Sequence, residues 1–172
     1  MSRAFVKEDD GGEPPIIPPR AALPAGATNY VTPQGLEKLR NEYEQLDTER
    51  NRLEVMPEKD SDARRELSII KAKIAQLNER IGSARVVDYK NENGDSVRFG
   101  ATVELKTIEG GKSGMKRKFQ IVGVDEADIS KGRIGFVAPI AKAVNGAKMG
   151  DRLTLQFGPT REVVELTTLK FI

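Results

Sequence analysis

The sequence predicts an α+β protein in which an N-terminal antiparallel α-helical coiled-coil hairpin precedes a β-sheet domain with one short helix. Residues 36–53 and 67–84 carry apolar side chains at alternating steps of three and four. This is the 3.5-residue period of a helix that keeps one face against a partner helix. From residue 86 onward the apolar residues form short runs rich in β-branched and aromatic side chains, as strands do.

The first 31 residues show neither pattern. Six of the nine prolines lie at or before Pro33, and proline cannot donate a backbone hydrogen bond. We therefore expect residues 1–31 to be a disordered, proline-rich extension. Alternatively, its apolar residues could form a short docking peptide; these are Phe5, Val6, Ile16 and Ile17.

The hairpin is predicted over residues 32–85. Thr32 followed by Pro33 is typical of an N-cap and a first helical residue, and Pro57 disfavours helical geometry just before it. Arg50 interrupts the apolar seam, and we expect it to extend toward solvent or to pair with a glutamate across the hairpin. Helices of about 24 and 21 residues reach roughly 30 to 36 Å at ~1.5 Å per residue. The tip should therefore lie far from the base.

Residues 86–172 are predicted to form the β-sheet domain. Turns containing glycine and asparagine separate its runs, and Pro139 begins a short helix that extends to Val144. The five predicted strands are residues 97–105, 119–124, 134–137, 152–157 and 163–171.

Composition narrows the chemistry. The chain has 172 residues, and 28 basic against 26 acidic side chains leave a formal charge of +2, so nucleic-acid contacts should be local. With no cysteine and no histidine, carboxylates, lysines, tyrosines and hydroxyls remain for chemistry. No apolar run approaches the ~18 residues of a membrane span, and the N-terminal residues lack the apolar run of a signal peptide. We expect a cytoplasmic monomer without membrane contact.

Short motifs in both predicted parts add a more specific indication. They are residues 32–39 (TPQGLEKL), 84–88 (ARVVD), 99–103 (FGATV), 119–123 (FQIVG), 125–128 (DEAD), 138–143 (APIAKA) and 150–151 (GD). Each is weak alone, but the ordered series covers residues 30–172. It resembles the Gre family of bacterial transcript-cleavage and elongation factors (GreA/GreB-like), which join a coiled-coil hairpin to an FKBP-like domain.

The resemblance implies a factor that is not itself an enzyme but stimulates the intrinsic nuclease activity of RNA polymerase. Gre factors dock their C-terminal domain at the rim of the polymerase secondary channel and insert the hairpin toward the active centre. Their tip carboxylates help to hold the second Mg²⁺ and the attacking water, so that a backtracked RNA is cut from its 3′ end. The protein would need no cofactor of its own, because Mg²⁺ is supplied at the polymerase active site. DNA-binding and transcription regulation are implied as associated properties.

The tip, residues 57–62, departs from the family pattern. The usual motif of glycine-aspartate, two residues, then glutamate-asparagine is absent, and each arm is shorter by about one heptad. If Asp60 takes the aspartate position, the residue three further on is Ala63, which cannot bind a metal. The resemblance assigns Asp60 and Asp62 as tip carboxylates and ligands of the shared Mg²⁺, with Glu58 as a further candidate. Alternatively, the aspartates only cap the second helix.

Basic residues and a proline complete the predicted site. The RNA-proximal candidates are Arg64, Arg65, Lys71 and Lys73, and the polymerase-docking candidates are Ala138, Pro139 and Ile140. The basic side chains, together with Arg52 and Arg80, would attract the phosphates of the extruded RNA, or they form a solvated face. The docking loop keeps the family's proline but replaces the polar pair before it with small apolar residues.

Two other functions stay open. The altered tip and short arms favour a regulator that occupies the channel without stimulating cleavage. The FKBP-like domain suggests a chaperone or prolyl isomerase, which turnover in a peptide isomerisation assay would support.

Overall fold

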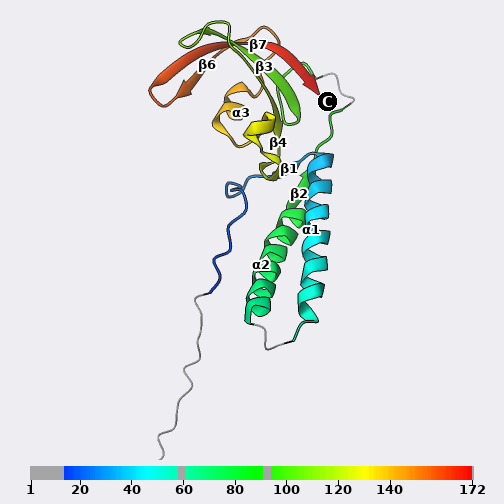
Figure 1. Ribbon diagram of the computed structural model, residues 1–172. Helices are drawn as coiled ribbons and strands as arrows, with labels where there is room; N and C mark the ends of the chain where they lie inside the picture. The colour runs from blue at the N-terminus through cyan, green and yellow to red at the C-terminus, as the bar shows by residue number, and fades with distance from the viewer. Residues whose placement is uncertain (1–13, 58–60, 91–93, 172) are drawn as a thin grey trace, which may run out of the picture.

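The computed structural model describes residues 14–57, 61–90 and 94–171. A helical hairpin projects from one side of a curved β-sheet domain, and its tip lies at the end remote from the sheet (Figure 1). The predicted α+β class is confirmed. Within the described ranges, no helix combines the length and apolarity that a membrane crossing requires.

The hairpin consists of α1 (Pro33–Glu54) and α2 (Ser61–Ser83). The Thr32 hydroxyl accepts a hydrogen bond from the Gly35 N–H at 3.0 Å, as expected for an N-cap. The apolar seam is confirmed, and its buried residues are Leu39, Leu53, Ala63, Ile70, Ile74 and Leu77.

Arg50 forms an ion pair, but along its own helix and not across the hairpin, which is one of the two alternatives expected from sequence. Its guanidinium lies 2.7 Å from the carboxylate of Asp47 on the same helix. Residues three apart on a helix are direct neighbours, so the local partner is within easy reach.

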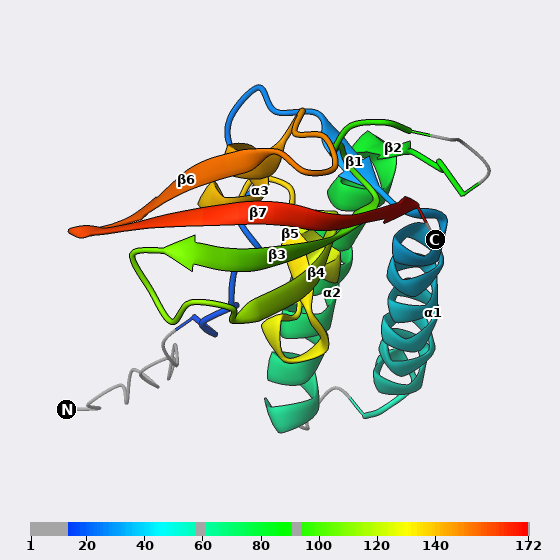
Figure 2. The same ribbon diagram turned by 90° about the horizontal axis from the view of Figure 1, so that it is seen from above.

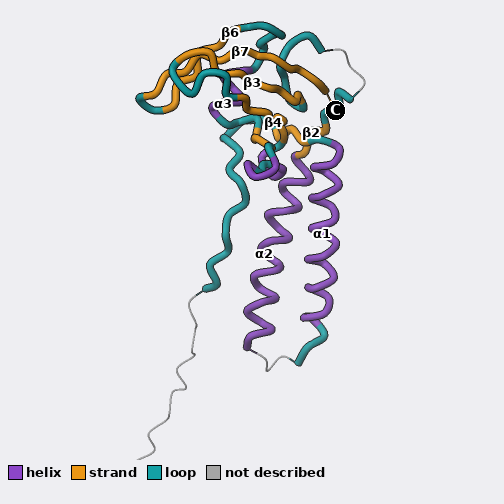
Figure 3. The backbone as a smooth tube through the Cα atoms, turned by 45° about the horizontal axis from the view of Figure 1, so that its top comes forward, coloured by secondary structure: helices purple, strands orange, loops and turns teal. Residues whose placement is uncertain are grey.

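The base of the hairpin contains two short strands that sequence patterns did not predict. β1 (Asn29–Val31) pairs in parallel with β2 (Ala84–Val86). The expectation of a disordered extension over residues 1–31 is therefore wrong for β1 and for the chain just before it, where Arg20 forms ion pairs. Figure 3 shows this segment descending beside the hairpin. Residues 1–13, including Phe5 and Val6, lie outside the described residues.

The larger sheet has the strand order β5-β4-β3-β7-β6. β4 and β5 are parallel, and the other neighbours are antiparallel. Its strands are β3 (Ala101–Glu109), β4 (Lys116–Val122), β5 (Arg133–Gly135), β6 (Arg152–Phe157) and β7 (Thr160–Phe171). The strand expected at residues 97–105 starts later because Gly100, at φ +84°, turns the chain before it.

One helix and two 3₁₀ turns accompany this sheet. α3 (Pro139–Val144) forms where predicted, and Figure 2 shows it beneath the strands. Its buried residues Ala141 and Val144 join the main core. The 3₁₀ turns are η1 (Val124–Glu126) and η2 (Ile129–Lys131).

A buried glutamate links three strands of the sheet. Glu162 of β7 accepts hydrogen bonds from the Thr107 hydroxyl of β3 and, at 2.8 Å, from the Arg117 guanidinium of β4. Burial acts to raise the pKa of Glu162, but these two partners outweigh it, so the pKa lies below its usual value. The carboxylate is therefore charged at neutral pH and stabilises the folded sheet.

Candidate functional site

The hairpin tip places an acidic and an apolar residue side by side. Asp62 lies in the first turn of α2 and is exposed, so it occupies a helical position rather than the N-cap. Ala63 is only 8% exposed and packs in the seam with Leu53. The positive end of the helix dipole favours a carboxylate at Asp62. The other two predicted tip carboxylates, Glu58 and Asp60, lie outside the described residues.

The predicted basic residues have different surroundings. Arg64, Arg65 and Lys73 are exposed on α2, whereas Lys71 pairs with Glu54 across the hairpin at 3.1 Å. Arg52 pairs with Glu49 on its own helix. Among the described residues, Arg64, Arg65 and Lys73 thus form no ion pair with α1, in contrast to Lys71.

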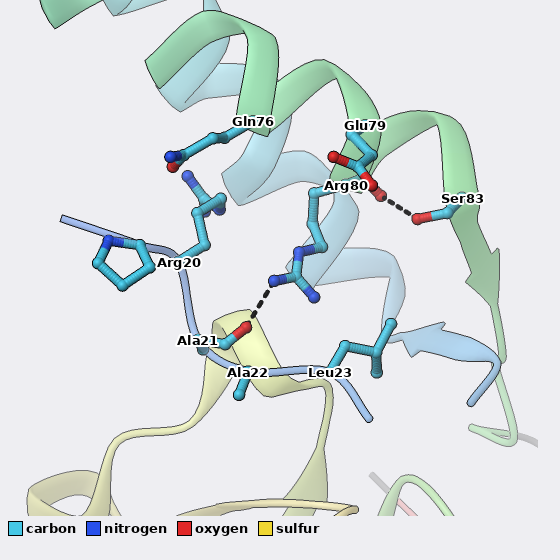
Figure 4. Close-up of a pocket in the computed structure, with 9 residues that line it drawn as sticks. Arg20, Ala21, Ala22, Leu23, Gln76, Glu79, Arg80 and Ser83 are labelled. Atoms are coloured by element: carbon cyan, nitrogen blue, oxygen red, sulfur yellow. Dashed lines mark hydrogen bonds between the residues drawn. The ribbon is translucent and has the colours of Figure 1, made fainter. Parts of the chain in front are cut away.

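Arg80 does not belong to this surface. Its side chain is only 13% exposed, pairs with Asp125 at 3.2 Å and donates to the carbonyl of Ala21. Figure 4 shows it reaching from α2 to the chain that precedes β1. The prediction of a solvated or RNA-lining role for Arg80 is therefore wrong, and its role is structural.

Arg20 also binds the chain that precedes β1 to the rest of the protein. Arg20 pairs with Glu42 of α1 at 2.7 Å and with Asp125 at 3.0 Å. These contacts raise the pKa of Arg20, with the Glu42 hydrogen bond contributing most. A cavity of about 320 Å³ lies between this stretch and α2. Arg80 donates to the Ala21 carbonyl (Figure 4), and Arg20 is paired with its two acids, so both arginines beside the cavity already have partners.

The hairpin joins the sheet domain through a second buried acid. Glu126 accepts hydrogen bonds from the Thr32 N–H and the Gly123 N–H, both at 3.0 Å, and from the Thr32 hydroxyl. A Cβ on Gly35 would lie 2.2 Å from its carboxyl carbon, and one on Gly123 would lie 2.8 Å from an oxygen. The two glycines thus make room for a carboxylate that holds the start of α1 against η1. Sequence patterns did not reveal this role.

The predicted docking loop lies beside an aromatic cluster. Pro139 is exposed at the start of α3, and Ala138 and Ile140 are half-buried. The rings of Tyr30, Phe99 and Phe136 have centroids 5.6 to 5.8 Å apart. They line a cavity of about 420 Å³, together with Ile121, Ala141, Lys142 and Asn145.

Sequence reasoning missed this cluster. Its rings come from three separate segments, and only their scarcity could have drawn attention to them, because the chain has three tyrosines, six phenylalanines and no tryptophan. Tyr30 is 38% exposed. An apolar surface of this kind suits contact with another protein.

The structure contains no preformed metal site in the residues it describes. No group of three or more acidic side chains in this part of the chain could hold an ion. A metal held by Asp62 would have to draw its other ligands from residues outside the described ranges or from a partner. The geometry is thus that of a projecting rod with an exposed, charged end.

Comparisons with known proteins identify sequence relatives of this chain. The family model described as "Transcription elongation factor, GreA/GreB, C-term" matches residues 90–170. The chain is 40% identical over 109 residues to transcription elongation factor GreA of Acidiphilium cryptum, covering 63% of this chain and 68% of that protein. It is 34% identical over 157 residues to GreA of Methylococcus capsulatus, covering 83% and 97%.

Solved structures give a weaker match. The GreA factor homolog 1 (Gfh1) of Thermus thermophilus is 22% identical, with a TM-score of 0.38 over 83% of this chain and 99% of that chain. Superposition at this level does not establish a family, whereas the sequence relatives do. The chain belongs to the GreA/GreB family of transcription elongation factors.

Proposed function

We propose that this protein binds RNA polymerase, inserts its hairpin into the secondary channel and stimulates cleavage of backtracked RNA. The observation that carries the proposal is the projecting hairpin, whose far end is exposed and charged. The relatives bear the name transcription elongation factor GreA, which supports polymerase as the partner and the cytoplasm as the place of action.

The hairpin is built to hold its tip in place. α1 has 22 residues and α2 has 23, so each spans roughly 33 to 35 Å at ~1.5 Å per residue. Leu53 is 4% exposed and Ala63 is 8% exposed, which shows that the seam stays packed to its far end. A rod packed along its whole length can present the tip at a defined distance from the sheet domain.

The tip would act by donating oxygen ligands. In this proposal Asp62, with Asp60, presents carboxylate oxygens to the Mg²⁺ of the polymerase active centre and orients the attacking water. Arg64 and Arg65 follow directly on the exposed part of α2 and would contact RNA phosphates. Lys73 would add salt-dependent attraction along the hairpin.

The docking surface in this proposal is the loop around Pro139 with the aromatic cluster beside it. Tyr30 lies in β1 at the hairpin base, whereas Phe99 and Phe136 belong to the sheet domain. A partner that contacts all three rings would therefore fix the hairpin and the sheet domain together. This would set the direction in which the hairpin points into the channel.

One observation favours a second candidate, a regulator that occupies the channel without stimulating cleavage. Ala63, three residues after Asp60, is packed in the hairpin seam. That position therefore offers no ligand. In this case the hairpin would only block the channel.

A stalled, backtracked elongation complex with Mg²⁺ separates the two candidates. The proposal predicts faster release of 3′ RNA fragments, lost in the double variant Asp60→Asn with Asp62→Asn while polymerase binding persists. Glu44→Gln, an exposed change on the side of α1, is the matched control and should keep full activity. Binding without any change in cleavage rate would support the channel-blocking candidate.

The docking surface is tested separately with Pro139→Asp. An acidic residue suits the first turn of a helix, so α3 should persist while an apolar contact is lost. We expect weaker polymerase binding and normal cleavage at saturating protein. Unchanged affinity would place the docking surface elsewhere.

A further inference from the structure

A second polar cavity, of about 300 Å³, lies where the base of the hairpin meets the sheet. It is separate from the tip and from the aromatic cluster. Three cationic side chains from distant parts of the chain line it, namely Lys38 of α1, Lys90 after β2 and Arg133 of β5. Within the described residues, none of the three forms an ion pair.

The charge at this cavity is unbalanced. The single acid in its lining is Glu126, whose oxygens already accept hydrogen bonds from Thr32 and Gly123. Three cations and one anion leave a net charge of +2 in the lining. All three cations are exposed, so solvent screens their mutual repulsion, and a bound anion would gain attraction from each of them.

Neutral donors at the cavity are also unused. Thr102 is 7% exposed and lines the cavity, yet its hydroxyl has no hydrogen-bond partner among the described residues. The Gln34 N–H, in the first turn of α1, makes no backbone hydrogen bond there. Gln34 and Gln120 also line the cavity, and each has a side-chain amide that can donate hydrogen bonds. Helix N-termini bind anions readily, and a hydroxyl can donate a hydrogen bond to one.

We propose that this cavity binds a diphosphate group, either as free diphosphate or as part of a nucleotide. Its volume is at the lower end of the range for small-molecule sites. A diphosphate carries several charged oxygens, which suits three cations and a set of neutral donors better than a monovalent anion does. The cavity lies at the base of the hairpin, away from the tip where RNA is expected, so a small anion suits it better than an RNA strand.

Binding here would have a structural consequence. The lining joins α1 to β3, β4 and β5, so the anion would bridge the hairpin and the sheet domain. A ligand that binds the folded protein alone raises its thermal midpoint. The inference does not depend on polymerase binding, because it concerns the free protein.

Isothermal titration calorimetry with the full chain tests the proposal. The probes are inorganic diphosphate, adenosine diphosphate and adenosine at constant ionic strength, and thermal unfolding is followed in parallel. We expect saturable binding of both phosphate compounds, no binding of adenosine, and a raised thermal midpoint. Tighter binding of the nucleotide than of diphosphate would identify a nucleotide as the source, and equal affinity would identify free diphosphate.

Variants localise the binding. Lys38→Ala, Lys90→Ala and Arg133→Ala should each weaken diphosphate affinity about tenfold, the effect of losing one charge-assisted hydrogen bond. Thr102→Val, which keeps the side-chain shape, should weaken it less. Lys112→Ala removes an exposed lysine in the turn between β3 and β4 and should leave affinity unchanged. Circular dichroism confirms that each variant is folded.

Two results would overturn the proposal. One is the absence of saturable heat with both phosphate compounds for the folded wild-type chain. The other is binding that persists undiminished when Lys38, Lys90 and Arg133 are replaced together, because this would place the anion elsewhere.

Discussion

Replacing Glu126 with alanine should destabilise the protein more than any surface change. The carboxylate satisfies the buried Thr32 N–H, the Gly123 N–H and the Thr32 hydroxyl. Its loss leaves these donors without a partner, at about 1 to 2 kcal/mol each, so the free energy of unfolding should fall by roughly 3 to 6 kcal/mol. This is a large share of the ~5 to 15 kcal/mol that stabilises a typical domain. Glu126→Gln keeps one acceptor oxygen and should show an intermediate loss.

Urea unfolding followed by circular dichroism at 222 nm measures this effect. Glu79→Ala is the matched control, because Glu79 is an exposed acid on α2 and alanine is a favourable helical residue. A loss below about 0.5 kcal/mol for Glu126→Ala, the level of an ordinary surface substitution, would show that the three donors do not depend on this carboxylate.

Three further predictions concern the same framework. Gly35→Ala should destabilise the protein about as much as the loss of Glu126, because a Cβ would lie 2.2 Å from that carboxyl carbon. A urea midpoint equal to that of the wild type would contradict this. Leu77→Ala, at a side chain with 0% exposure, should cost about 2 to 5 kcal/mol, and a smaller urea shift would mean that the seam collapses around the gap. Because the folded-state pKa of Glu162 is lowered, the unfolded chain binds a proton more readily. The stabilisation from Glu162 should therefore be present above its usual pKa of 4.5 and be lost as the pH falls below it. Glu162→Gln should flatten this acid dependence in urea titrations between pH 3 and 5, roughly the range in which the group titrates; an unchanged slope would refute it.

The hairpin could be predicted from sequence because its signals are local. The seam residues recur with one period, and Thr32 before Pro33 marks the first turn of α1. The start of α3 could likewise be predicted from Pro139. In each case the residues that determine the element lie within it or next to it.

The junction could not be predicted because its contacts join distant residues. Glu126 and its partner Thr32 are 94 positions apart, and Asp125 and Arg20 are 105 apart. In the sequence, Asp125 and Glu126 belong to the short motif at residues 125–128, but nothing in that motif indicates their partners. β1 has three residues, too few for a periodic pattern to emerge. The preceding prolines indicated disorder, yet Arg20 fixes that chain through two ion pairs.

In the candidate site, too, local features could be predicted from sequence, whereas features that depend on contacts between distant residues could not. Asp62 is exposed, as expected for a residue of the polar tip, and Arg64 and Arg65 beside it are exposed as well, although α2 begins at Ser61 and so includes all three. The ion pair of Lys71 with Glu54 depends on the register of two helices, which sequence spacing alone leaves open. The aromatic cluster beside Pro139 required the fold to bring Tyr30 to the sheet domain.

Site-specific photo-crosslinking tests the central claim, insertion of the hairpin into the polymerase channel. A photoreactive residue at Ser61, the exposed first residue of α2, is incorporated into the full chain and irradiated with a backtracked elongation complex. Insertion of the hairpin predicts crosslinks to the lining of the polymerase active centre or to the RNA 3′ end, abolished by excess unlabelled protein. Crosslinks confined to the outer surface of the polymerase, with the protein fully bound, would contradict it.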